Sequence, residues 1–210
     1  MAQSSAKNFY SLIFILLPLT FLWAETGQSG ELPRLAVIGV TNGTAEKELS
    51  NLLITQGIAQ LAAQELYDTG FFVPIEDNPE ITGRINELVS LSLHSGAEEL
   101  DPDRLFSTGR ELGCQSVATV KITQLNKSRS RVGFGPFSSA KVKVKIEVEV
   151  SLKNDENPLI SARGIGSGIT RSKSFLFLVR KDKVSFDKTS VGRATQEAVR
   201  KAVLNLTSIL

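Results

Sequence analysis

The sequence predicts an α+β fold, an α/β sandwich in which three or so helices pack on a mixed β-sheet with a long antiparallel hairpin. The main observation is the alternation over 141–152, where apolar residues alternate with lysine, glutamate or serine. Such alternation is typical of a strand with one buried and one solvated face. A turn at 154–158 and a returning strand at 159–170 complete the hairpin. Helical spacing over 44–67 and 189–210 predicts helices that cover the sheet.

The first 24 residues predict a secretory signal peptide. Lys7 precedes an apolar run from Phe9 to Ala24, and Glu25 follows the run directly. The run has sixteen residues and contains Pro18, whereas a membrane-spanning helix needs about 20. We therefore expect cleavage after Ala24, with an uncleaved anchor as the alternative. No cysteine stands near the end of this leader, so we expect no lipid anchor of the bacterial lipoprotein type.

The folded domain is expected to span 34–210 and to begin with a strand, a helix and a second strand. Residues 25–33 are polar and contain glycine and proline, which is typical of a linker. Nearly continuous apolar residues over 34–40 predict a buried strand. The apolar face of 44–67 predicts the first helix, and 71–75 predict the next strand.

The middle of the chain is expected to add two helices and a strand. Apolar spacing over 81–93 indicates a helix, although Gly83 and two serines weaken the pattern and the helix is expected to end early. A stronger helix begins at Pro102 with Asp101 as its N-cap. A third strand follows over 116–125.

Three glycines, Gly164, Gly166 and Gly168, lie in the returning strand of the hairpin. A dinucleotide-binding loop has a different glycine spacing and lies between a strand and a helix. We therefore interpret these glycines as bulges or as positions of tight packing.

Composition limits the classes of function. The chain is 41% hydrophobic and 22% charged, which is typical of a globular protein. Without the single charge of the leader, the net charge falls from +2 to +1, so no global field favours nucleic acid. Cys114 is the only cysteine and His94 the only histidine. A disulfide within the chain is therefore excluded, and neither a metal site nor a catalytic pair is recognisable.

Two segments are candidate partner-contact surfaces. Residues 126–139 are expected to form a basic loop that is either solvated or binds phosphates, anionic lipid headgroups or an acidic partner. The apolar residues 175–179 are followed by three nearby cations, and they form either a core strand or an insertion into a membrane or a partner. The candidate contact residues are Lys127, Arg129, Arg131, Phe134, Phe137, Phe175, Phe177, Arg180 and Lys181.

Five segments carry a resemblance to a known family: RLAVIGVTNGT, LYDTGFFVPIED, GRELGCQSVATVKITQL, AKVKVKIEVEVSLKN and TSVGRATQEAVRKAVLNL. They cover most of 34–206, and in this order they resemble segments of the curli-assembly secretion (CsgG-like) superfamily. They are more distantly similar to the outer-membrane lipoprotein activators of penicillin-binding proteins. The resemblance implies a periplasmic α/β domain that binds and oligomerises without catalysis. The lipid-bearing cysteine of the curli pore has no counterpart in this sequence.

We therefore predict a non-enzymatic, exported accessory protein of the cell envelope, either periplasmic or secreted. It would bind an envelope protein or assemble with copies of itself as a homo-oligomer. The alternative is a subunit of an oligomeric outer-membrane secretion channel. A hydrolase would need a nucleophile and a base in a recognisable arrangement. We expect no cofactor and no nucleic acid partner, and any association with the outer membrane would occur without a lipid anchor.

Overall fold

The computed structural model describes residues 31–75, 78–94, 101–134, 137–155, 158–170, 177–180 and 183–210. The expected signal peptide, most of the expected linker, and the candidate residues Phe175 and Lys181 lie outside these ranges.

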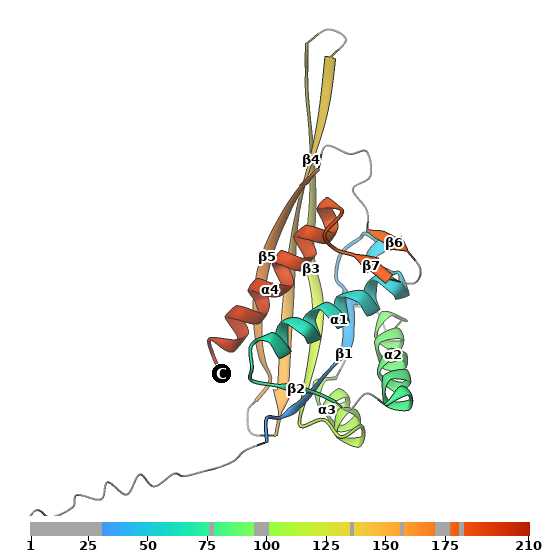
Figure 1. The fold of residues 1–210 in the computed structure, drawn as a ribbon, viewed down its shortest axis with the longest axis vertical. Helices are drawn as coiled ribbons and strands as arrows, with labels where there is room; N and C mark the ends of the chain where they lie inside the picture. The colour runs from blue at the N-terminus through green and yellow to red at the C-terminus, as the bar shows by residue number, and fades with distance from the viewer. Residues whose placement is uncertain are drawn as a thin grey trace, which may run out of the picture. The chain divides into compact units, whose positions relative to one another are not determined.

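The expected mixed sheet is confirmed, with five strands in the order β2-β1-β3-β4-β5 (Figure 1). The strands are β1 (Arg34–Asn42), β2 (Val73–Pro74), β3 (Ser116–Phe134), β4 (Phe137–Asn154) and β5 (Ile160–Thr170). β1 is parallel to both of its neighbours, whereas β3, β4 and β5 run antiparallel to one another. A second, two-stranded sheet joins β6 (Leu178–Arg180) to β7 (Lys183–Ser185).

Four α-helices accompany the sheet in the described part of the chain: α1 (Leu52–Asp68), α2 (Pro79–His94), α3 (Pro102–Glu111) and α4 (Ser190–Thr207). The helix expected over 44–67 begins later, after a short 3-10 helix, η1 (Lys47–Ser50), because Asn51 is extended and caps α1 by accepting a hydrogen bond from the Leu53 amide. Helix α2 continues to His94, so the early end expected for it is wrong. Asp101 caps α3 as expected.

The core occupies both faces of β1. Leu35 and Val37 belong to the larger core, which also contains the even-numbered residues of β4. Helices α1 and α4 cover this core. Ala36 and Ile38 point to the opposite face and join a smaller core with Phe106 of α3. β1 is therefore buried on both faces, which explains why its sequence is a continuous apolar run rather than an alternation.

Helix α4 packs directly on the backbone of β5 because that strand presents glycine to it. A Cβ at Gly164, Gly166 or Gly168 would lie 1.9–2.0 Å from a backbone carbonyl oxygen of α4. The β4–β5 register runs without interruption past all three glycines. Of the two interpretations of these glycines, the structure therefore shows tight packing and no bulge.

Side chains of α4 also cover the outer edge of β5. Arg193 donates a hydrogen bond to the Ile169 carbonyl at 2.6 Å, and Asn205 donates to the Arg163 carbonyl at 2.8 Å. The Ser167 amide donates to the Glu197 carboxylate at 2.8 Å. These helix residues satisfy edge groups that would otherwise be open to pairing with another strand.

The expectation of a loop over 126–139 is wrong. β3 continues to Phe134 and β4 begins at Phe137, and the two strands stay paired up to these two residues. The cations and serines of this segment alternate with the strand period, but both sets are polar. An alternation without an apolar face carries no burial signal, and for this reason the segment resembles a loop in the sequence.

The first prediction compares two glycines. Gly166→Ala should lower the free energy of unfolding by about 3 kcal/mol or more, because the new methyl group meets the backbone of α4. Gly83→Ala in α2 is the matched control, since a Cβ there meets nothing within 4 Å. It should stabilise the protein by up to about 1 kcal/mol through helix propensity. Urea denaturation measures both changes, and equal effects would contradict the tight contact.

The second prediction concerns alkaline pH. Burial raises the pKa of Tyr67 to about 12 and that of the Cys114 thiol to about 11, and the Tyr67 hydroxyl donates to the Leu35 carbonyl at 2.9 Å. Both groups bind their protons more tightly in the folded protein than in the unfolded chain. The stability that this difference contributes is fully present below about pH 9 and is lost as the pH rises through the two raised pKa values. The free energy of unfolding should therefore fall from about pH 9 upward, and Tyr67→Phe/Cys114→Ala should flatten this decline. An unchanged slope in the double variant would contradict the assignment.

Candidate functional site

The candidate site is an arm formed by the far ends of β3 and β4. β1 pairs with β3 only as far as Ile122, and β5 pairs with β4 only as far as Val142. Beyond these positions, within the described part of the chain, β3 and β4 pair only with each other. We define the arm as 126–134 of β3 with 137–145 of β4. Its base, 142–145, still pairs with 167–170 of β5. Figure 1 shows the arm projecting past the helices.

The arm carries positive charge on both faces. Residues 124–146 contain six lysines or arginines and no aspartate or glutamate. Residues directly opposite each other in an antiparallel pair share a face. The positions of Lys127, Arg129 and Arg131 lie opposite Val144, Val142 and Ala140, on the face that continues from the main core. The other face bears Lys141, Lys143 and Lys145, opposite Ser130, Ser128 and Asn126.

Most of the described cations of the arm lack an ion-pair partner. Lys127, at the base of the arm, forms an ion pair with Glu46. Arg129, Lys141, Lys143 and Lys145 are exposed, and none of these four forms an ion pair with another residue of the described ranges. Such cations are available to an anionic partner without the loss of an internal contact.

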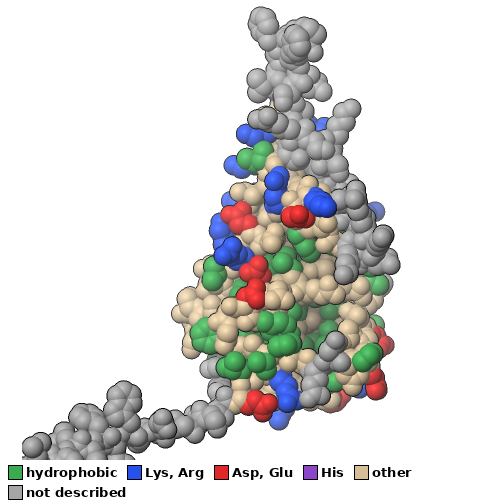
Figure 2. Space-filling view, viewed as in Figure 1, with side chains coloured by type: hydrophobic (Ala, Val, Ile, Leu, Met, Phe, Trp, Pro, Cys, Tyr) green, Lys and Arg blue, Asp and Glu red, His purple; other side chains and the backbone are tan. Residues whose placement is uncertain are grey.

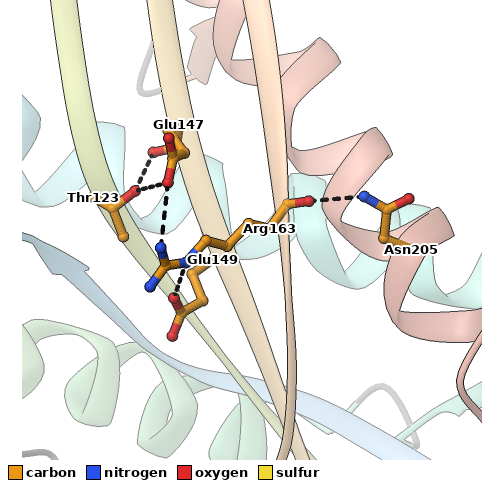
Figure 3. A network of polar contacts seen from close by, with 5 residues as sticks. All are labelled: Thr123, Glu147, Glu149, Arg163 and Asn205. Carbon is orange, nitrogen blue, oxygen red and sulfur yellow. Dashed lines mark hydrogen bonds and ion pairs between the residues drawn. The ribbon is translucent and has the colours of Figure 1, made fainter.

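The acidic residues nearest to the lysine row are already engaged (Figure 3). Glu147 and Glu149 continue that row along β4, and Arg163 of β5 lies between them. Its Nε donates to Glu149 Oε2 at 2.6 Å, and its Nη1 lies 3.7 Å from Glu147 Oε1. The hydrogen bond to Glu149 and the charge of that carboxylate raise the pKa of Arg163. The acidic side chains of β4 are therefore directed to Arg163 and not to the lysines.

The second candidate segment lies partly in the core. Phe177 is partly buried against the main core, and its ring meets that of Phe186 edge to face with 5.8 Å between centroids. Arg180 is in β6, opposite Lys183. The structure brings together one residue from each candidate segment, because Phe177 and Lys127 line the same small hollow of about 10 Å³. A hollow of this size holds no ligand larger than a water molecule.

Sequence reasoning missed the lysines of β4 as site residues. Lys141, Lys143 and Lys145 were expected only as the wet face of a strand. The available signal was the absence of any acidic residue over 124–146, and this signal has meaning only once both halves of the arm are paired. Among the described residues, no group of three or more histidine, cysteine, aspartate or glutamate side chains could hold a metal ion. Within the same ranges, every helix is too short or too polar to span a bilayer.

Comparison with known proteins does not assign a family. No protein-family model matches the chain, and no curated protein matches it. The fold is similar to the crystal structure of lipoprotein GNA1162 from Neisseria meningitidis, at 13% identity and a TM-score of 0.41, over 69% of this chain and 88% of that one. It is also similar to the hypothetical protein CT253 from Chlamydia trachomatis, at 12% identity and a TM-score of 0.32, over 81% and 95% of the two chains. Both TM-scores are below 0.5, so the resemblance to the CsgG-like superfamily stays a prediction.

The third prediction tests the role of Arg163. Arg163→Gln should change the free energy of unfolding only slightly, because the Arg163 side chain is largely exposed to solvent. It should nevertheless weaken binding of a polyanion, since Glu147 and Glu149 become free to attract the lysines. Lys201→Gln breaks another exposed ion pair, that with Glu197, changes the net charge equally, and should leave polyanion binding unchanged. Denaturation together with titration by polyglutamate measures both effects, and equal polyanion binding by the two variants would contradict this role.

Proposed function

We propose that this chain is an exported, non-catalytic binding protein of the cell envelope that contacts an anionic partner through the arm. The observation that carries the proposal is the charge of the arm, which has cations at positions on both faces and no acidic residue over 124–146. The predicted signal peptide supports export. The resemblance of five segments to the CsgG-like superfamily supports an envelope domain that works by binding.

The charge of the arm argues against direct pairing between the arms of two copies. Such pairing would place lysines and arginines of like sign opposite one another, which is destabilising. Arg129, Lys141 and Lys143 are exposed and form no ion pair with another described residue. Binding an anionic molecule would therefore break no ion pair of these three cations. The complementary partner is therefore an anionic molecule rather than a second arm.

The rest of the fold favours the arm over the sheet edges as the contact surface. α4 covers the outer edge of β5 through Arg193, Glu197 and Asn205. On the other side of the sheet, Ser92 of α2 accepts a hydrogen bond from the Val40 amide of β1 at 3.1 Å. Strand addition at either place would require these side chains to move. The arm needs no such rearrangement.

The fourth prediction tests the proposed function with polyglutamate as a model anionic partner. Lys141→Glu/Lys143→Glu should abolish binding at low salt, because it replaces two of the three exposed lysines of the row with acids. Arg84→Glu/Lys188→Glu is the control, since it changes the net charge equally at two exposed sites outside the arm. The control should retain most of the binding. Binding by the unsubstituted protein should weaken as salt screens the exposed charges.

Two results would overturn the proposed function. Equal loss of polyglutamate binding in both double variants would show that only the net charge matters. Light scattering that reveals a large ring dependent on detergent would favour the secretion channel instead.

A further inference from the structure

The face of β4 and β5 that points away from α4 exposes two isoleucines. The glycines of β5 face α4, so the residues between them point to the other side of the strand. Two of these residues have large exposed fractions, 41% for Ile165 and 45% for Ile169. At the end of β4 away from the arm, Lys153 forms an ion pair with Asp103 of α3 and lies over the Phe106 ring. Beside the two isoleucines, by contrast, β4 presents exposed lysines.

These lysines are close neighbours of the isoleucines. Lys143 is directly opposite Ile169 in the β4–β5 register, which places their Cβ atoms about 4.5–5.5 Å apart. Lys141 and Lys145 are diagonal neighbours of Ile169 at about 7–8 Å, and Lys145 is also diagonal to Ile165. Figure 2 shows lysine and arginine side chains gathered on the described surface toward the arm. We call these three lysines and two isoleucines the mixed patch.

A partner that covers the mixed patch needs two kinds of side chain. The three lysines form no ion pair with another described residue, and carboxylates complement them. The isoleucines contribute to binding only when apolar atoms remove them from water. A purely acidic chain would satisfy the lysines but would place carboxylates against the isoleucines. The complementary partner therefore carries acidic and apolar side chains next to each other.

The dimensions of the mixed patch fit an α-helix better than an extended chain. The lysine row spans about 14 Å along β4, and the isoleucine row lies about 4.8 Å to its side on β5. A helix is about 10 Å in diameter, so a helix that lies along β4 covers both rows, whereas an extended chain follows one. On the opposite face of the same two strands, α4 packs in this way. A helix on the mixed patch would thus give this part of the sheet a layer on each face.

The neighbouring acids favour a polypeptide over a membrane surface. Glu147 is directly opposite Ile165, and Glu149 lies two residues further along β4. A planar anionic surface that covered Ile165 would also approach these two carboxylates and would be repelled by them. A helix can place neutral side chains beside the two acids while its own acids meet the lysine row.

From these observations we infer that the mixed patch binds an amphipathic helix of a partner protein. Its acidic side chains lie against the lysine row of β4, and its apolar side chains cover Ile165 and Ile169. This inference rests on the proposed function and specifies the anionic partner. The ion pairs fix the position of the helix along β4, and the apolar contacts add affinity that salt does not screen.

The fifth prediction uses a model peptide of about 20 residues, which forms about 30 Å of helix. Glutamates and leucines occupy adjacent faces of this helix. The full chain should bind it at least about tenfold more tightly than polyglutamate with the same number of glutamates, because the leucines cover the isoleucines. A scrambled peptide of the same composition, with its leucines distributed around the helix, should lose this advantage. Fluorescence anisotropy of the labelled peptides measures the affinities.

Two substitutions on β5 test the isoleucines. Ile165→Thr/Ile169→Thr keeps β-branched side chains, which favour a strand, and should weaken peptide binding at least about fivefold. Polyglutamate binding should stay unchanged, because the lysine row is intact. Leu204→Thr/Ile209→Thr is the control, since it alters two exposed apolar side chains on and just after α4, and it should leave both affinities unchanged. Far-ultraviolet circular dichroism checks that both variants remain folded.

The outcomes separate this inference from the proposed function. Equal affinity for the peptide and polyglutamate, or equal effects of the two threonine pairs, would overturn the amphipathic helix as the partner. If Lys141→Glu/Lys143→Glu still abolished polyglutamate binding, the proposed function would stand and the partner would be recognised by charge alone. If that lysine variant bound both the peptide and polyglutamate normally, both proposals would fail.

Two further measurements test other occupants of the mixed patch. Light scattering that shows association between copies, lost in Ile165→Thr/Ile169→Thr, would make the occupant a second copy of this chain. Flotation with phosphatidylglycerol vesicles that depends on the same two isoleucines would make it a membrane. Either result would overturn a partner helix, and the absence of both supports it.

Discussion

The contact between α4 and the three glycines of β5 is the constraint on which the rest of the structure depends. Ala194, Ala198 and Ser190 of α4 place their carbonyl oxygens where a Cβ of β5 would stand. The helix therefore lies directly on the strand backbone and buries the apolar residues of β4 beside it. Any residue larger than glycine would lift the helix away from this surface, and the buried face of the hairpin would lose its cover.

The same contact decides which surfaces remain available. With α4 held close to β5, Arg193, Glu197 and Asn205 reach the edge of that strand and satisfy its backbone groups. The opposite face of β4 and β5 stays exposed, and there Arg163 binds Glu147 and Glu149. Arg163 thus connects the two sides, since its carbonyl accepts from Asn205 while its guanidinium holds the two acids. The lysines beyond them are left without a balancing charge, and this gives the arm its chemistry.

Much of the fold could be predicted because its signals are local. The alternation over 141–152 and the cap at Asp101 depend on neighbours in sequence. The structure confirms the cap and places 141–152 inside the longer strand β4. Three errors share one cause. The arm depends on strand pairing between polar residues, and the late start of α1 depends on a polar cap. The full length of α2 runs through a pattern that glycine and serine interrupt. The hydrophobic pattern gives no indication of secondary structure at such positions.

The sequence by itself determined the fold class, the buried hairpin, the absence of a second cysteine and the presence of cations at 127–131, because these follow from residue type and period. It could not determine how the cations are arranged. The face on which each charge lies is set by the register of β3 against β4, and the bulge near Ile122 shifts that register by one residue. A shift of one residue in a strand exchanges its two faces. Only the tertiary structure therefore decided that Lys127 faces Glu46 while the lysines of β4 face away, so that the arm is charged on both sides.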